Sequence, residues 1–217
     1  MVNILFDCPN LDDFREELSP YFSSESRVAV VALSFYDDYV YDAESWARVY
    51  ARGEGCFEVV DALAAFGVKR ENVRFINYFT DTKEQARQTV EWANTLYFTG
   101  GLPDRMMERI EELELVDALR RHDGVVVGYS AGAVIQLGEY HLSPDSDYAE
   151  FGYYRGIGYL DGFYIEVHYE HRPTQDDAIR RVLLERGAPV LVTHTRQGGI
   201  VVDGGKIRLL GRVDEYR

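Results

Sequence analysis

The sequence has few cysteines and no excess of positive charge. Cys8 and Cys56 are its two cysteines, and neither belongs to a CxxC motif, so we expect no disulfide framework and no thiolate metal site. No HExxH motif is present either, and we expect neither a metal nor a cofactor. The formal net charge of −14 makes nucleic acid and anionic membrane surfaces poor partners.

Long apolar runs are also missing. The segment from Met1 to Asp7 has no basic region followed by an extended apolar core, and no other stretch is long enough to span a bilayer. We therefore expect no signal peptide and a cytoplasmic protein. The 217 residues contain 16 tyrosines and can bury a substantial core, which argues against disorder. Without an internal repeat or a linker-like segment, we expect a single domain over residues 1–217.

Strand-like and helix-like segments alternate along the chain. The predicted strands cover residues 27–33, 72–77, 95–98 and 125–128, and the predicted helices cover residues 11–26, 43–66, 81–94 and 104–120. This alternation is typical of βαβ units and predicts a three-layer α/β fold with a mostly parallel, doubly wound sheet. A strand over 162–167, a helix over 176–186, a strand over 188–192 and a C-terminal hairpin over 199–210 complete the prediction.

A Gly-x-Ser-x-Gly motif lies where the strand predicted over 125–128 meets an apolar, helix-like run. Gly128 and Gly132 flank Ser130 at a distance of two residues. At a strand-to-helix corner this pattern is typical of a nucleophile elbow, in which a strained turn pushes the serine out at the end of the sheet. The same motif also fits a tight strand–helix crossing with an incidental serine, because it often occurs by chance.

Gly100 and Gly101 end the strand that precedes the elbow unit. They should therefore lie near Ser130 at the same edge of the sheet. A glycine turn can aim a backbone N–H into a site, and together with the amide of Ala131 it could form a two-donor oxyanion hole. A turn that needs glycine only for its dihedral angles is the alternative.

A serine nucleophile needs a base, and His168 is the best candidate. It follows the strand predicted over 162–167, in polar surroundings at the end of that strand. The other histidines are weaker candidates, because they lie in charged turns, in polar loops or after another predicted strand in the sequence: His122, His141, His171 and His194.

Three carboxylates compete to orient the histidine. Glu170 would point to the same side as His168 if the strand continued, because side chains alternate along a strand. Asp145 lies in a turn-rich loop that could fold over the histidine, and Glu166 lies on the His168 face of the strand but further into the sheet. The residues alone leave these three alternatives open.

Taken in order, Gly100-Gly101, the hexapeptide 128–133, His168 and the closing hairpin resemble the peptidase E family. This family includes aspartyl dipeptidases and cyanophycinases, and its fold is similar to that of class I glutamine amidotransferases. The resemblance runs from about residue 28 onward, and the hexapeptide is its most specific part. It implies a serine peptidase that cleaves small peptides, with Ser130 as nucleophile, His168 as base, and Gly101 and Ala131 as oxyanion donors.

The resemblance also bears on the acid and on the substrate. It favours Glu170, because His168-Tyr169-Glu170 is similar to the His-x-Glu of amidotransferases, with Asp145 second because it falls near the aspartate of aspartyl dipeptidases. Those dipeptidases hold the substrate aspartate with an arginine where this chain has Gln175. The residues expected at the substrate, and the arginines that could take over this role, are Gly100, Gln175, Arg172, Arg180 and Arg155.

Three other functions fit parts of the pattern. An α/β-hydrolase esterase shares the elbow, but it places the acid before a late histidine, and here only Asp145 precedes His168. A glutamine amidotransferase would need a cysteine in place of Ser130. A non-catalytic binding or regulatory protein on the same fold is the third. We expect a monomer or a homodimer that takes a small peptide as its substrate.

Overall fold

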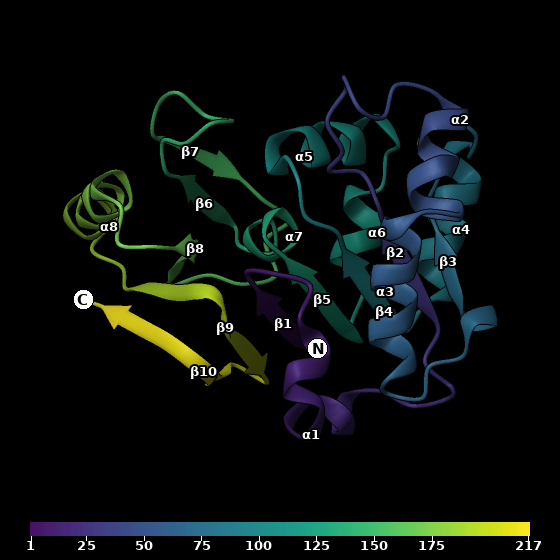
Figure 1. The fold of residues 1–217 in the computed structure, drawn as a ribbon, viewed down its shortest axis with the longest axis horizontal. Coiled ribbons are helices and arrows are strands. Elements are labelled where there is room, and N and C mark those ends of the chain that lie inside the picture. The colour runs from purple at the N-terminus through teal and green to yellow at the C-terminus, as the bar shows by residue number, and fades with distance from the viewer.

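The computed structural model describes residues 1–217, and an eight-stranded sheet lies at its centre (Figure 1). The order along the sheet is β10-β9-β1-β5-β4-β2-β3, and β8 joins it by pairing with β9. These strands are β1 (Val2–Phe6), β2 (Val28–Val31), β3 (Val73–Phe75), β4 (Thr95–Phe98), β5 (Val125–Tyr129), β8 (Tyr164–Tyr169), β9 (Val190–Asp203) and β10 (Lys206–Tyr216). A separate two-stranded sheet consists of β6 (Glu139–Leu142) and β7 (Gly152–Arg155).

In the eight-stranded sheet most neighbouring strands run parallel, and the antiparallel pairs involve β9, while β6 and β7 of the small sheet are also antiparallel. Strands β1 to β5 pair parallel with one another, and β8 pairs parallel with β9. β9 runs antiparallel to both β1 and β10. The prediction of a mixed α/β fold with a mostly parallel sheet and a C-terminal hairpin is therefore confirmed.

Helices cover both faces of the sheet. Because side chains alternate along a strand, Ala29 and Val31 of β2 enter one core, and Val28 and Val30 enter the other. The first core also receives side chains of α4 (Lys83–Trp92), α5 (Pro103–Glu112), α6 (Val116–Arg120) and α7 (Ala131–Val134). The second receives side chains of α1 (Arg15–Leu18), α2 (Ala43–Trp46) and α3 (Glu54–Ala64). This is the predicted three-layer arrangement.

Strand β1 lies in the middle of the sheet, although the predicted alternation does not include it. It pairs with β5 on one side and β9 on the other, and Ile4, Leu5 and Phe6 are fully buried. A run of only five residues at a chain terminus offers little periodicity to read. Its position brings the residue that follows it, Asp7, to the carboxyl end of β5.

Two predicted helices are divided in the structure. The helix predicted over 104–120 becomes α5 and α6, with a left-handed residue, Glu114, at φ 55° between them. The helix predicted over 43–66 becomes α2, a π-helical turn (Ala47–Ala51) and α3. The segment 11–26 forms only α1 and short 3₁₀ turns (Leu11–Phe14 and Ser19–Tyr21), and a further 3₁₀ turn spans Arg70–Asn72.

The last helix, α8 (Pro173–Arg186), packs on β8 and β9 through a small core of its own. Figure 1 shows α8 on the opposite side of the molecule from α2, α3 and α4. None of the helices combines the length and the apolar composition needed to traverse a lipid bilayer.

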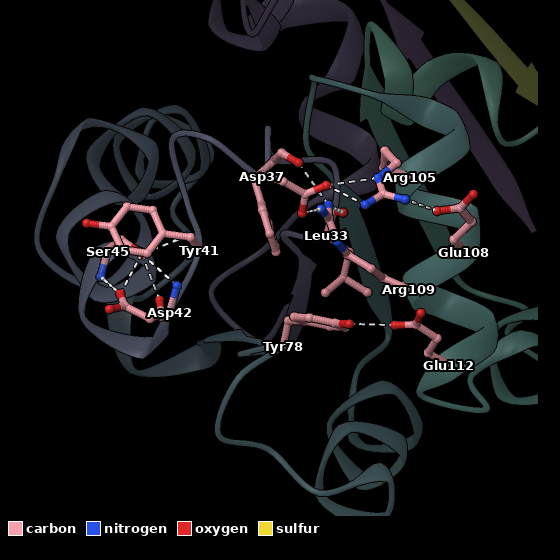
Figure 2. Close-up of polar contacts among 11 residues, drawn as sticks. Leu33, Asp37, Tyr41, Asp42, Ser45, Tyr78, Arg105, Glu108, Arg109 and Glu112 are labelled. Carbon is pink, nitrogen blue, oxygen red and sulfur yellow. Dashed lines mark hydrogen bonds and ion pairs between the residues drawn. The ribbon is translucent and has the colours of Figure 1, made fainter.

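A buried arginine fixes the loop that follows β2. The guanidinium of Arg109 donates to the backbone oxygens of Leu33 and Phe35 at 2.6 and 2.9 Å, and to the carboxylate of Asp37 at 2.7 Å. Figure 2 shows this side chain reaching from α5 toward Leu33 and Asp37, and the more exposed Arg105 approaching the same carboxylate. The anchored loop continues into residue 36, which lines the cavity described next.

Candidate active site

The elbow between β5 and α7 has the geometry that its glycines predict. Ser130 adopts φ 51° and ψ −116°, which is a strained conformation for a residue with a side chain. A Cβ atom on Gly128 would lie 1.9 Å from the backbone oxygen of Gly132, and one on Gly132 would lie 2.2 Å from the oxygen of Phe98. The turn can therefore be this tight only with glycine at both positions.

His168 meets the serine from β8. Its Nε2 atom lies 2.8 Å from Oγ of Ser130, within hydrogen-bond distance. The pairing between β8 and β9 shifts register between Glu166 and Tyr169, and His168 itself has φ 54°. This irregularity turns the imidazole out of the regular strand and toward the elbow.

Asp7 lies behind the imidazole. Its Oδ2 atom is 3.7 Å from Nδ1 of His168, which is longer than a hydrogen bond, and the two side chains form an ion pair when the imidazole is protonated. The same oxygen accepts hydrogen bonds from the backbone N–H of Arg196 and from the thiol of Cys8. Burial alone would raise the pKa of Asp7, but His168, Arg196 and Cys8 together hold this pKa below its ordinary value. A fully buried, ionised carboxylate therefore faces the histidine.

Asp7, Cys8 and His168 also form a group of side chains that could hold a metal ion. The possible ligand atoms of Asp7, Cys8 and His168 lie within 4.8 Å of one another. However, burial and the neighbouring carboxylate raise the pKa of the Cys8 thiol to about 11. Since the thiolate is the form that binds metals, the group fits a hydrogen-bonding role better.

The glycine turn after β4 lies beside the elbow. Gly101 has φ 134°, and a Cβ atom there would lie 2.2 Å from the backbone oxygen of Ser34. The hydroxyl of Ser34 donates to the oxygen of Gly100, and the oxygen of Ser34 accepts from the N–H of Leu102 at 2.7 Å. The N–H groups of Gly101 and Ala131 donate to no acceptor within the protein.

A cavity of about 200 Å³ opens beside the serine. Gly101, Ser130, Ala131 and His168 all line it, so the predicted nucleophile, base and amide donors share one space. The remainder of its wall comes from the loop after β2, from β6 and the loop that follows it, from β8, and from the start of α8. Its polar side chains outside that group are Tyr36, His141, Ser143, Asp145, Asp147, Tyr148, Glu166, Arg172 and Gln175.

None of the three predicted acids bonds to the imidazole of His168. Glu170 is mostly exposed and its nearest charged partner is Arg172, at 3.8 Å, because the left-handed backbone of His168 ends the expected alternation and the strand itself ends at Tyr169. Oδ1 of Asp145 accepts from the backbone N–H groups of residues 147 and 148, which makes it part of a turn. Glu166 binds His141 and Ser143 instead of His168. The acid that the structure brings to His168 is Asp7.

Of the residues expected at the substrate, Gln175 is buried against the backbone, whereas Arg172 is partly exposed in the cavity wall. Gln175 is buried, and its amide nitrogen donates to the backbone oxygen of His168 while its amide oxygen accepts from the N–H of Glu170, both at 3.0 Å. This glutamine therefore supports the turn that carries the histidine. Arg172 lines the cavity with a half-exposed side chain, whereas Arg155 and Arg180 do not line it.

Sequence reasoning did not single out Asp7, Tyr36 or Ser143 as site residues, and it placed His141 among the weaker histidines. The available signal for Asp7 was the apolar run Val2–Phe6 with an acidic residue directly after it. This pattern is typical of a strand that places a carboxylate at the edge of a sheet. The other three come from a loop and from a small antiparallel sheet whose short strands carry little pattern.

Comparison with known proteins identifies the family and the fold. The sequence model of Peptidase family S51 matches residues 47–210, which is more than half of the chain. A search among curated proteins finds no match. Among solved structures, the fold is similar to that of a candidate peptidase E protein from Listeria monocytogenes EGD-e, with a TM-score of 0.66 and 14% identity, over 97% of this chain and 98% of that chain. It is also similar to a peptidase from an acI-B1 Actinobacterium, with a TM-score of 0.62 and 14% identity, over 99% of this chain and 93% of that chain.

Proposed function

The chain belongs to peptidase family S51 and is a serine-type peptidase, and on this basis we propose that Ser130, His168 and Asp7 form a catalytic triad that hydrolyses small peptides. The observation that carries the proposal is the 2.8 Å contact between Oγ of Ser130 and Nε2 of His168, with an ionised carboxylate on the far side of the ring.

The roles follow from the chemistry of each group. His168 accepts the proton of Ser130 at Nε2 as the hydroxyl oxygen attacks the peptide carbonyl carbon. Asp7 faces Nδ1 of the ring at 3.7 Å, and its negative charge stabilises the imidazolium that forms. A hydrogen bond from Nδ1–H to Asp7, which fixes the tautomer, forms when the two atoms move closer in the reacting complex. The imidazolium then donates its proton to the leaving amine, and water hydrolyses the acyl-serine by the same steps.

The N–H groups of Gly101 and Ala131 are the proposed oxyanion donors. Both residues line the cavity at Ser130, and neither amide donates to another group of the protein. The Ala131 amide is also at the beginning of α7. Donors that are already fixed in position stabilise the negative charge of the tetrahedral intermediate, and loss of one typically costs about 10²- to 10³-fold in rate.

The test is hydrolysis of a peptide panel. The panel contains dipeptides and tripeptides with different first residues, including Asp-X and isoaspartyl peptides, together with a long-chain chromogenic ester. We expect peptide hydrolysis, little ester hydrolysis, and a loss of at least about 10³-fold in Ser130→Ala. Ser146→Ala, at an exposed serine outside the cavity, is the matched control and keeps full activity. Full activity of Ser130→Ala would overturn the proposed triad.

A further inference from the structure

The cavity beside Ser130 contains more negative than positive charge. Three carboxylates line it, those of Asp145, Asp147 and Glu166, against one guanidinium, that of Arg172. Asp145 and Asp147 are exposed, and both already bind parts of the surrounding loops. Glu166 differs from them because it is 5% exposed.

Glu166 is a buried carboxylate with one oxygen left unpaired. Oε2 accepts hydrogen bonds from Nε2 of His141 at 2.8 Å and from the hydroxyl of Ser143 at 2.7 Å. Oε1 accepts none, and it is not sealed inside the protein. Glu166 forms no ion pair with a lysine or an arginine. A carboxylate removed from bulk water and facing a cavity is stabilised by a cation that enters that cavity.

We propose that this cavity binds a cationic group on the acyl side of the substrate, an ammonium or a guanidinium, with Oε1 of Glu166 as its acceptor. Glu166 and Ser130 line the same cavity, so the cation and the scissile carbonyl belong to one acyl residue. A cavity of about 200 Å³ is smaller than the roughly 300–1,000 Å³ of typical small-molecule sites and suits a single residue. The proposal rests on the proposed peptidase function and names its substrate class.

The same geometry disfavours an aspartyl residue in this position. If its side chain took the place proposed for the cation, its carboxylate would face Glu166, and like charges in a partly enclosed site repel. Gln175 is uncharged and supplies no opposing positive charge, and both ends of its amide are engaged by the turn at His168. Arg172, which lines the cavity and lies 3.8 Å from Glu170, is the guanidinium that could meet the carboxylate of a short peptide.

Binding is measured on the Ser130→Ala variant, so that the result does not depend on turnover. The ligands are Lys-Ala, acetyl-Lys-Ala, norleucyl-Ala, acetyl-norleucyl-Ala and Asp-Ala, titrated by calorimetry. Acetyl-Lys-Ala carries a cation only on its side chain, and norleucyl-Ala carries one only at its amino terminus. Acetyl-norleucyl-Ala carries no cation. We expect it to bind about 10- to 100-fold more weakly than the better of the two ligands with one cation, acetyl-Lys-Ala or norleucyl-Ala, because only a correctly placed cation meets Glu166.

Glu166→Gln keeps the shape of the side chain but removes its charge. In the Ser130→Ala background we expect this change to abolish the preference for the cationic ligand while binding of acetyl-norleucyl-Ala is unchanged. Unchanged binding of that neutral ligand also shows that the cavity has folded. Glu150→Gln, at an exposed acid outside the cavity, controls for the change in net charge and keeps the preference.

Each outcome bears on one claim. Equal binding of charged and neutral ligands, or a preference that survives Glu166→Gln, would overturn the cationic subsite. Tighter binding of Asp-Ala than of norleucyl-Ala, which has the same amino terminus, would overturn the expected exclusion of an aspartyl side chain. A preference that depends on Glu166, in a protein that hydrolyses no peptide, would support the subsite and overturn the proposed function instead.

Discussion

Oδ2 of Asp7 lies 3.7 Å from Nδ1 of His168, although Asp7 follows the first strand of the chain and His168 lies near the end of the eighth. The central position of β1 makes this possible, since the carboxyl end of β1 lies next to that of β5 and the elbow. The N–H of Ser130 donates to the oxygen of Phe6 at 2.9 Å, so the acid and the nucleophile are fixed to the same piece of backbone.

Asp7→Asn should therefore impair catalysis more than it impairs folding. The amide cannot stabilise an imidazolium, and its nitrogen can donate to Nδ1 and so favour the wrong tautomer of His168. In an established triad the equivalent change lowers kcat about 10⁴-fold, and we expect a fall of about 10²- to 10⁴-fold, measured as kcat on the best peptide of the panel.

Glu170→Gln is the matched comparison for Asp7→Asn. Glu170 is exposed and pairs only with Arg172, so we expect less than a threefold change in kcat. If Glu170→Gln were the more damaging substitution, the acid would be Glu170 and the role of Asp7 would be structural.

The lowered pKa of Asp7 also predicts how stability depends on pH. A carboxyl whose pKa is lower in the folded state stabilises the fold fully above its unfolded pKa of about 3.9. That contribution is lost as the pH falls through the lower, folded value. The free energy of unfolding, measured in urea between pH 2 and 7, should fall less steeply with acid in Asp7→Asn than in the wild type. Parallel curves for the two proteins would contradict this assignment.

Gln175→Ala distinguishes two possible roles of Gln175, support of the His168 turn and binding of the substrate. As a support of the His168 turn, Gln175 should affect kcat, and we expect kcat to fall about tenfold with little change in KM. A residue that binds the substrate would instead raise KM and leave kcat unchanged. Steady-state kinetics on one peptide distinguishes the two, and Gln88→Ala, on the exposed face of α4, is the control.

Arg109→Met tests the anchor of the loop after β2. The substitution leaves the buried carbonyl groups of Leu33 and Phe35 without their donor, and we expect a loss of roughly 2–5 kcal/mol in the free energy of unfolding. Arg105→Met removes an exposed guanidinium from the same carboxylate of Asp37, and should cost less than about 1 kcal/mol. Equal losses, measured by urea unfolding, would show that the ion pair and not the carbonyl contacts anchors the loop.

The sequence predicted those parts of the fold and the site that carry a local pattern. The elbow is one, because its glycines, its strand and its helix are adjacent in the chain. The contact between Ser130 and His168 was expected because both follow strands at the same sheet edge, and the structure brings the two together. The partner of His168 could not be found in this way, because alternation along β8 stops at the left-handed backbone of His168 itself. The acid comes from β1, whose place in the sheet depends on pairing with strands that are distant in sequence.

The central claim is that His168 activates Ser130, and covalent labelling by a fluorophosphonate tests it most directly. The rate of labelling is followed by mass spectrometry, which also identifies the modified residue, in the wild type, Ser130→Ala and His168→Ala. We predict stoichiometric labelling at Ser130 in the wild type, none in Ser130→Ala, and labelling at least about 10²-fold slower in His168→Ala. Labelling of Ser130 at the wild-type rate in His168→Ala would contradict the account.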